Sequence, residues 1–184
     1  ERMKIKMNRT AGILLPITSL PSKYGIGCFF KLSYEFVDWL KEAGQCYWQI
    51  LPLVPTSYGD SPYQSFSTYA GNPYFIDLEK LIAEGVLTKK ECEAVDFGTN
   101  ESDIDYEKMY NGRYHLLRIA YERSNISENP DYNQFVDENA WWLKDYALFM
   151  ACKDKHEGRN WHSWEEEYRN PSKAMKKTMA KEFE

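Results

Sequence analysis

Two short apolar stretches decide the fold, Gly12-Ile13-Leu14-Leu15-Pro16-Ile17 and Cys46-Tyr47-Trp48-Gln49-Ile50-Leu51-Pro52-Leu53. Neither alternates strictly between apolar and polar residues, which is typical of strands buried on both faces of a parallel sheet. Between them, residues 32–43 show the apolar face of a helix, and Gly44 follows as its C-terminal cap. The order strand, helix, strand predicts a βαβ unit with a right-handed crossover.

The residues after this unit predict helices and no further strand. Cap signals stand at Asp77 and at Thr88 with Glu91, and a longer helix is expected to begin at Asp105. The segments predicted to be helical are 78–84, a short helix after Thr88, 105–124, 132–138, 141–156, and a last helix that starts at Asn170-Pro171 and is still running at residue 184. A parallel pair of strands cannot stand alone, so either these helices or further chain must cover it.

The composition is that of an ordinary globular domain with many rings. The chain has 184 residues, of which 43% are hydrophobic and 16% aromatic, including 14 Tyr and 6 Trp. Rings suit either a thick core, which is the commoner use, or a surface that stacks against the apolar C–H faces of sugars. Composition leaves both interpretations open.

Several classes of function are disfavoured. The net charge is −5 and the basic residues are scattered, so we expect no nucleic-acid partner. The apolar stretches are far shorter than the ~20 residues of a membrane span. Residues 1–8 carry no export signal and read as a terminal segment or added residues. Four widely spaced cysteines and three histidines without metal-ligand spacing predict a cytoplasmic protein that uses no metal and no cofactor.

The strongest functional signal follows the second predicted strand. The segment Tyr58-Gly59-Asp60-Ser61-Pro62-Tyr63-Gln64-Ser65-Phe66-Ser67 alternates rings with small polar groups, and Gly71-Asn72-Pro73-Tyr74 lies just beyond it. In barrels and open α/β sheets, ligands bind on loops at the carboxyl ends of the strands. Rings supply stacking area, and amides and hydroxyls supply directional hydrogen bonds to a hydroxyl-rich ligand. A packed Ω-loop without a ligand is the alternative.

Several stretches resemble the amylomaltase family, also called 4-alpha-glucanotransferases or disproportionating enzymes. They are residues 9–22 with 24–27 for the opening of the family, 43–53 for its second barrel strand, 58–67 with 71–74 for the loop on the donor side of the glucan cleft, and 142–151 with 161–164 for a helix and turn of its inserted subdomain. The matches run in order over nearly the whole chain. The sequence departs from the common pattern at Cys28, Phe29 and Phe30, where many members have an acidic residue and a glycine. We expect Cys28 to be a buried or half-buried thiol, because no partner for a nucleophile is identifiable around it.

The resemblance implies an α/β fold: the amino-terminal part of a (β/α)₈ TIM barrel, with its first two strands here, plus a mainly helical inserted subdomain. The implied division is 1–8 as a terminal segment, 9–75 as the first βαβ unit with the substrate loop, 76–170 as the helical subdomain, and 171–184 as the start of a helix that leads back to the barrel.

The resemblance also implies an activity, the transfer of α-1,4-glucan segments to glucose or maltooligosaccharide acceptors with retention. Retention needs two carboxyl groups about 5 Å apart, one as nucleophile and one as acid/base. The family carries them on later strands, whose motifs do not occur here, so this chain holds no catalytic residue. We expect it to have no transfer activity alone.

The residues expected to contact the glucan all lie in the recognised loop. They are Tyr63 beside the scissile bond, Ser61 and Gln64 as polar partners, Tyr58 at the rim, and Asp60 and Asn72. Asp60 has an alternative role as an acceptor of backbone hydrogen bonds in a turn. Asn72 has an alternative role in shaping the loop.

Two other functions compete with the enzyme. One is a stand-alone α-glucan-binding module without catalysis, and the other is an interaction fragment that uses its helices as a docking surface. Uncovered strand edges would in addition favour self-association.

Overall fold

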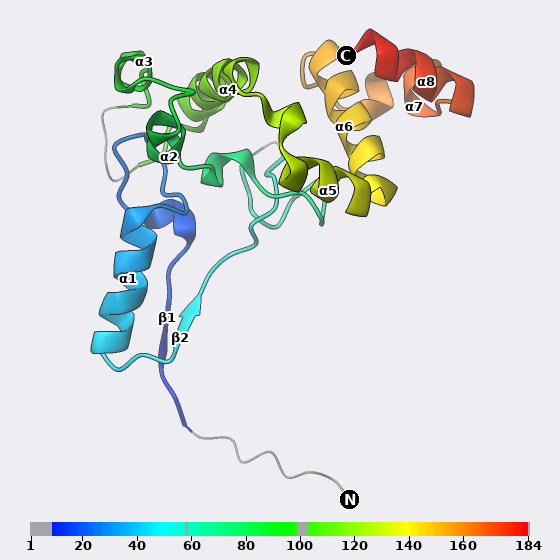
Figure 1. Ribbon diagram of the computed structural model, residues 1–184. Helices are drawn as coiled ribbons and strands as arrows, with labels where there is room; N and C mark the ends of the chain where they lie inside the picture. The colour runs from blue at the N-terminus through cyan, green and yellow to red at the C-terminus, as the bar shows by residue number, and fades with distance from the viewer. Residues whose placement is uncertain (1–8, 58, 99–102, 184) are drawn as a thin grey trace, which may run out of the picture. The chain divides into compact units, whose positions relative to one another are not determined.

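The computed structural model describes residues 9–57, 59–98 and 103–183 (Figure 1). Contacts divide the chain into two compact units, the first ending at Asn125 and the second beginning at Ile126. The first unit contains β1 (Gly12–Leu14), η1 (Ile17–Ser19), α1 (Lys31–Glu42), β2 (Tyr47–Gln49), η2 (Pro73–Phe75), α2 (Leu78–Ala83), α3 (Lys89–Ala94) and α4 (Tyr106–Arg123), where η marks a 3₁₀ turn. The second contains η3 (Ile126–Glu128), α5 (Pro130–Glu138), α6 (Ala140–Lys155), η4 (Trp161–Ser163), α7 (Glu166–Arg169) and α8 (Lys173–Glu182).

The predicted βαβ unit is confirmed. Strands β1 and β2 are parallel, with Gly12 opposite Tyr47, and α1 connects them along the chain (Figure 1). The N–H of Leu15 donates to the carbonyl of Gln49 at 3.0 Å and continues the ladder past β1. The described residues form no strand other than these two. Both strands therefore end at the same edge, where the chain continues into the loops that hold the candidate site.

The two strands are more exposed than their sequence predicts. Leu14 is 57% exposed and Tyr47 65% exposed. Trp48 is half-buried, because its ring packs against Phe36 of α1 at 4.8 Å and its indole N–H donates to the carbonyl of Leu15 at 2.8 Å. The expectation of burial on both faces is wrong for this chain alone, since a two-stranded sheet keeps both edges open and α1 covers one side.

The core of the first unit lies beside the candidate site. It joins α2, α3 and α4 to η2, and its buried members are Tyr24, Ile26, Tyr74, Leu78, Leu87, Cys92, Phe97, Met109, Leu116 and Ala120. Leu116 and Ala120 lie on the buried face of α4. Tyr74 belongs both to this core and to the wall of the candidate site.

The predicted caps Asp77 and Thr88 fix the starts of α2 and α3, and Asp105, which was expected to begin a helix, is the N-cap of α4. The side chains of Asp77, Thr88 and Asp105 each accept a backbone N–H from the first turn of their helix. Thr88 and Glu91 form the predicted reciprocal capping box. None of the described helices combines the length and the apolar character needed to cross a membrane.

The last helix differs from its prediction. It was expected to start at Asn170-Pro171 and to run to the end, but α8 spans Lys173–Glu182. Ser172 is its N-cap, because the Ser172 hydroxyl accepts the N–H of Met175 at 3.1 Å, which satisfies a donor of the first turn. The contact boundary at Asn125 falls within the stretch 76–170 that was expected to form one subdomain. The boundaries drawn from the sequence stay predictions about a longer protein.

The four cysteines are free thiols in different surroundings. Cys28, Cys92 and Cys152 are buried, whereas Cys46 is exposed. Burial raises the pKa of the Cys28 thiol to about 11, and the nearby Arg113 guanidinium opposes that rise. The expected buried thiol at Cys28 is confirmed.

Ellman's reagent at pH 8 is therefore expected to titrate one thiol quickly and the other three only as the chain opens. A pKa near 11 leaves Cys28 with about 100-fold less thiolate than an ordinary cysteine. The fast phase should disappear in Cys46→Ser and persist in Cys92→Ser. Two fast thiols in the native chain would contradict this assignment.

Candidate functional site

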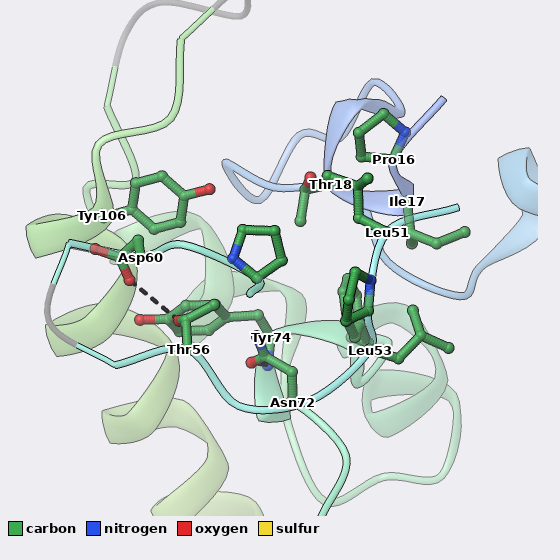
Figure 2. A pocket seen from close by; sticks show the side chains of 13 residues that line it. Pro16, Ile17, Thr18, Leu51, Leu53, Thr56, Asp60, Asn72, Tyr74 and Tyr106 are labelled. Carbon is green, nitrogen blue, oxygen red and sulfur yellow. Dashed lines mark hydrogen bonds between the residues drawn. The ribbon is translucent and has the colours of Figure 1, made fainter. Parts of the chain in front are cut away.

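A cavity of about 120 Å³ opens at the carboxyl ends of β1 and β2 (Figure 2). Residues that follow β1 form one part of its wall and residues that follow β2 form another. The lining residues are Pro16, Ile17, Thr18, Leu51, Pro52, Leu53, Thr56, Asp60, Pro62, Asn72, Tyr74, Phe75 and Tyr106. Its position is the one where α/β folds bind ligands.

The recognised loop closes on itself through its backbone. The N–H of Ser57 donates to the carbonyl of Gln64 at 3.0 Å, the N–H of Asp60 to the carbonyl of Ser57 at 3.0 Å, and the N–H of Gln64 to the carbonyl of Ser61 at 3.1 Å. Tyr58, one of the predicted sugar contacts, lies outside the described residues. We call residues 57–64 the tyrosine loop.

Tyr63, Ser61 and Gln64 lie on the tyrosine loop but do not line the cavity. Tyr63 is 74% exposed, and its N–H donates to the Ser61 hydroxyl at 3.3 Å. Ser61 is half-buried and Gln64 is exposed. The ring of Tyr63 is thus accessible to a ligand at the surface, although its backbone is fixed by hydrogen bonds.

Asp60 points into the cavity wall. Its backbone has a φ of +53°, a left-handed conformation that Asp tolerates better than most residues, directly after Gly59 at +87°. Its Oδ1 accepts a hydrogen bond from the Thr56 hydroxyl at 3.2 Å (Figure 2). Burial raises the pKa of the Asp60 carboxyl, and the hydrogen bond from Thr56 opposes that rise.

Asn72 lines the same cavity but already uses its side-chain oxygen. It is buried, its Oδ1 accepts the N–H of Tyr74 at 3.0 Å, and its own N–H donates to the carbonyl of Leu53 at 2.9 Å. These bonds cap η2 and tie the far end of the loop to the segment after β2. The contacts are those of a residue that shapes the loop.

Sequence reasoning missed three polar residues of the cavity, Thr18, Thr56 and Tyr106. Tyr106 begins α4 and reaches the cavity only through the tertiary fold, so no local signal points to it. Thr56 lies two residues before the recognised motif, and a hydroxyl four residues before Asp60 was the available signal. Burial raises the pKa of both Tyr74 and Tyr106, and the neighbouring charge of Asp60 adds to the rise.

The cavity offers hydroxyl, phenol, amide and carboxylate groups, which suit a hydroxyl-rich ligand. Asp60 is the carboxylate among its lining residues, whereas a retaining mechanism needs a pair. Within the described ranges, no cluster of three or more His, Cys, Asp and Glu side chains is placed to hold a metal ion. The lining residues thus offer polar partners for such a ligand, but they do not include a nucleophile with an acid/base partner.

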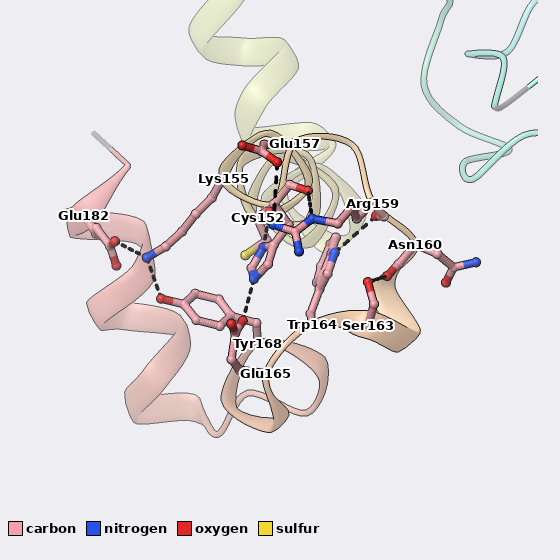
Figure 3. A network of polar contacts seen from close by, with 11 residues as sticks. Cys152, Lys155, Glu157, Arg159, Asn160, Ser163, Trp164, Glu165, Tyr168 and Glu182 are labelled. Carbon is pink, nitrogen blue, oxygen red and sulfur yellow. Dashed lines mark hydrogen bonds and ion pairs between the residues drawn. The ribbon is translucent and has the colours of Figure 1, made fainter.

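A second polar cluster lies in the second unit (Figure 3). The Nδ1 of buried His156 is 2.6 Å from the carbonyl of Cys152, and its Nε2 is 2.7 Å from Glu165 Oε2. The ring also stacks on Trp164 at 4.8 Å. Lys155 contributes nearby hydrogen bonds to the hydroxyl of Tyr168 and to Glu182. Because both nitrogens of His156 are engaged and its ring is covered, this cluster ties α6 to α7 and is not a candidate catalytic site.

The fold and the site define an α/β chain with a polar cavity at the carboxyl ends of two parallel strands. The sequence profile described as 4-alpha-glucanotransferase matches residues 15–184, and the chain belongs to this family. The 4-alpha-glucanotransferase of Clostridium butyricum is 51% identical over 148 residues, which are 80% of this chain and 30% of that protein. The Thermus thermophilus relative is 43% identical over 164 residues, 87% of this chain and 32% of that protein.

A solved structure described as amylomaltase from Streptococcus agalactiae in complex with acarbose matches with a TM-score of 0.87. It is 34% identical, and the match covers 96% of this chain and 36% of that chain. The predicted family is confirmed. The chain spans about a third of the length of these relatives.

Proposed function

We propose that this chain is the amino-terminal part of a 4-alpha-glucanotransferase that moves α-1,4-glucan segments to glucose or maltooligosaccharide acceptors by retaining double displacement. One observation carries the role of this segment: an exposed Tyr63 on a loop closed by hydrogen bonds, next to a polar cavity at the strand ends. Family membership supports the reaction, and the acarbose complex of the Streptococcus agalactiae amylomaltase supports an oligosaccharide ligand.

In this proposal the tyrosine loop is one wall of a glucan cleft. Tyr63 is the first sugar contact, Ser61 and Gln64 are its polar partners, and Tyr58 stands at the rim. Asp60 and Asn72 complete the wall from the cavity side, where both line it. The catalytic carboxylates belong to other segments of the complete protein.

The fold proposal follows from the two strands. We propose that β1 and β2 are the first strands of a (β/α)₈ barrel, with a mainly helical insertion over 76–170 and a return toward the barrel from residue 171. The exposure of Leu14 and Tyr47 supports this arrangement, because further strands would cover them. Alone, the chain is expected to self-associate through the same edges. The four free cysteines support a cytoplasmic location.

Titration of the chain with maltoheptaose tests the sugar role of Tyr63. Tyr63→Ala is expected to weaken binding about tenfold, ~1.4 kcal/mol, because a stacking ring is lost. Tyr34→Ala is the matched control, since Tyr34 on α1 is 70% exposed, close to the 74% of Tyr63. Equal affinities of wild type and Tyr63→Ala, or no binding by either, would remove the sugar role of the loop.

Transfer activity needs a complete protein. We define a chimera as the Clostridium butyricum enzyme in which this chain replaces the matching segment. The chimera is expected to release glucose from maltotriose, whereas the 184-residue chain alone is expected to release none. Glucose release by the chain alone would contradict the assignment of the carboxylates to other segments.

A further inference from the structure

The position of Tyr63 depends on its backbone, because burial does not anchor its ring. Three backbone hydrogen bonds close the tyrosine loop, at 3.0, 3.0 and 3.1 Å, and all of them join residues of the loop to one another. They set the shape of the loop, but they do not fix it to the rest of the first unit. A side-chain hydrogen bond from a residue outside the loop can contribute to that attachment.

Asp60 is placed to be this attachment. Its carboxylate accepts the hydroxyl of Thr56, the residue just before the loop, across four residues of chain. It also lines the cavity with Tyr74, which belongs to the buried core, and Tyr106, which begins α4 (Figure 2). The Asp60 side chain therefore lies where the tyrosine loop meets the wall of the cavity.

The left-handed backbone conformation of Asp60 needs contacts that stabilise it. A non-glycine residue with a φ of +53° sits in a sparsely populated region, and such conformations persist when their surroundings determine them. A hydrogen bond to an ionised carboxylate is stronger than one between neutral groups, and more so in a half-buried site. The Thr56–Asp60 bond, at 3.2 Å, is a side-chain contact that favours this conformation.

We propose that Thr56 and Asp60 are positioning residues, whose hydrogen bond holds the left-handed turn at Gly59 and Asp60 and thereby presents Tyr63 to the glucan. This inference rests on the proposed function. It assigns Asp60 a role through Tyr63, and it adds Thr56, which lies outside the recognised motif. A direct sugar contact by the Asp60 carboxylate is the alternative outcome of the test.

Three substitutions isolate the bond. Thr56→Val keeps the shape and removes the hydroxyl, Thr56→Ser keeps the hydroxyl, and Asp60→Asn keeps a residue that tolerates a positive φ while it removes the charge. Hydrogen exchange of the 184-residue chain measures how readily the loop opens in the absence of any ligand. The amides of Asp60 and Gln64, which are bonded within the loop, are expected to exchange about tenfold faster in Thr56→Val and at the wild-type rate in Thr56→Ser.

The kinetics of the chimera measure how the lost hydrogen bond affects substrate binding. Thr56→Val is expected to raise the KM for maltotriose about tenfold and to leave kcat within about twofold, because it loosens a wall that binds substrate and transition state alike. Thr56→Ser should restore the KM. An unchanged KM in Thr56→Val would overturn the positioning role. A higher KM in Asp60→Asn without faster exchange of the loop amides would also overturn it, because that result indicates direct contact between Asp60 and the sugar.

Tyr63→Ala separates this inference from the function on which it rests. If Tyr63→Ala raises the KM but Thr56→Val changes neither exchange nor KM, the glucan wall stands and the positioning role is wrong. If Tyr63→Ala leaves the KM of the chimera and the affinity for maltoheptaose unchanged, the proposed function of the loop is wrong. The inference that Thr56 and Asp60 position Tyr63 for a sugar is then also wrong, whatever the exchange rates show.

Discussion

Replacing Gly27 with alanine is expected to lower the melting temperature of the first unit by roughly 10 °C. An added Cβ would overlap the carbonyl oxygen of Ile17 and would lie 2.7 Å from the carbonyl oxygen of Leu20. Both are backbone atoms, so no side chain can rotate away, and overpacking of this kind costs about 3 kcal/mol. Because η1 lines the cavity, maltoheptaose binding should weaken as well. Differential scanning calorimetry with and without the sugar measures both effects.

Gly71→Ala is the matched control for this substitution. A Cβ at Gly71 meets no heavy atom within 4 Å, so its effect should stay within about 0.5 kcal/mol. Each glycine lies near cavity-lining residues in the sequence, Gly27 after Thr18 and Gly71 before Asn72. They differ in the space that a Cβ atom would find. Equal melting temperatures of Gly27→Ala and wild type would show that the segment of η1 is free to move.

Replacing Trp164 with alanine is expected to unfold the second unit. Trp164 is 5% exposed, stacks on His156, and lies 5.5 Å from the ring of Phe149. Its indole N–H donates to the carbonyl of Arg159 at 3.2 Å. Truncation of a buried Trp costs about 3–5 kcal/mol, which is comparable to the whole stability of so small a unit. Hydrogen exchange should show lost protection of α6–α8.

Trp161→Ala tests whether burial, and not the loss of any tryptophan, causes this effect. Trp161 is 43% exposed and stands three residues away in the same segment. Its truncation should cost less than about 1 kcal/mol and leave the protection of α6 in place. Equal losses in the two variants would contradict the assignment of Trp164 to the core of this unit.

The parts of the fold that sequence predicted well depend on neighbouring residues. The starts of α2, α3 and α4 were found because the acceptors of Asp77, Thr88 and Asp105 act within one turn of their helix. The start of α8 was misplaced because the helix was expected to begin at Asn170-Pro171, whereas the Ser172 hydroxyl caps the first turn. Local hydrogen-bond chemistry therefore decided both the successes and this error.

The parts that sequence could not supply depend on distant residues. The motif pointed to Asp60 and Asn72, which do line the cavity, but Tyr106 joins them only because α4 packs against η2. The exposure of Leu14 follows from the rest of the sheet, which a pattern of apolar residues does not describe. Whether Tyr63 touches a sugar is a property of a complex and stays a prediction.

The double membership of Tyr74, in the buried core and in the cavity wall, links recognition to folding. A ligand that binds against the Tyr74 ring stabilises the folded packing of α2, α3 and α4. At a ligand concentration of a hundred times its dissociation constant, this stabilisation is about 2.7 kcal/mol. Occupancy of the cavity should consequently stiffen α2 and α3, which contribute no residue to its lining.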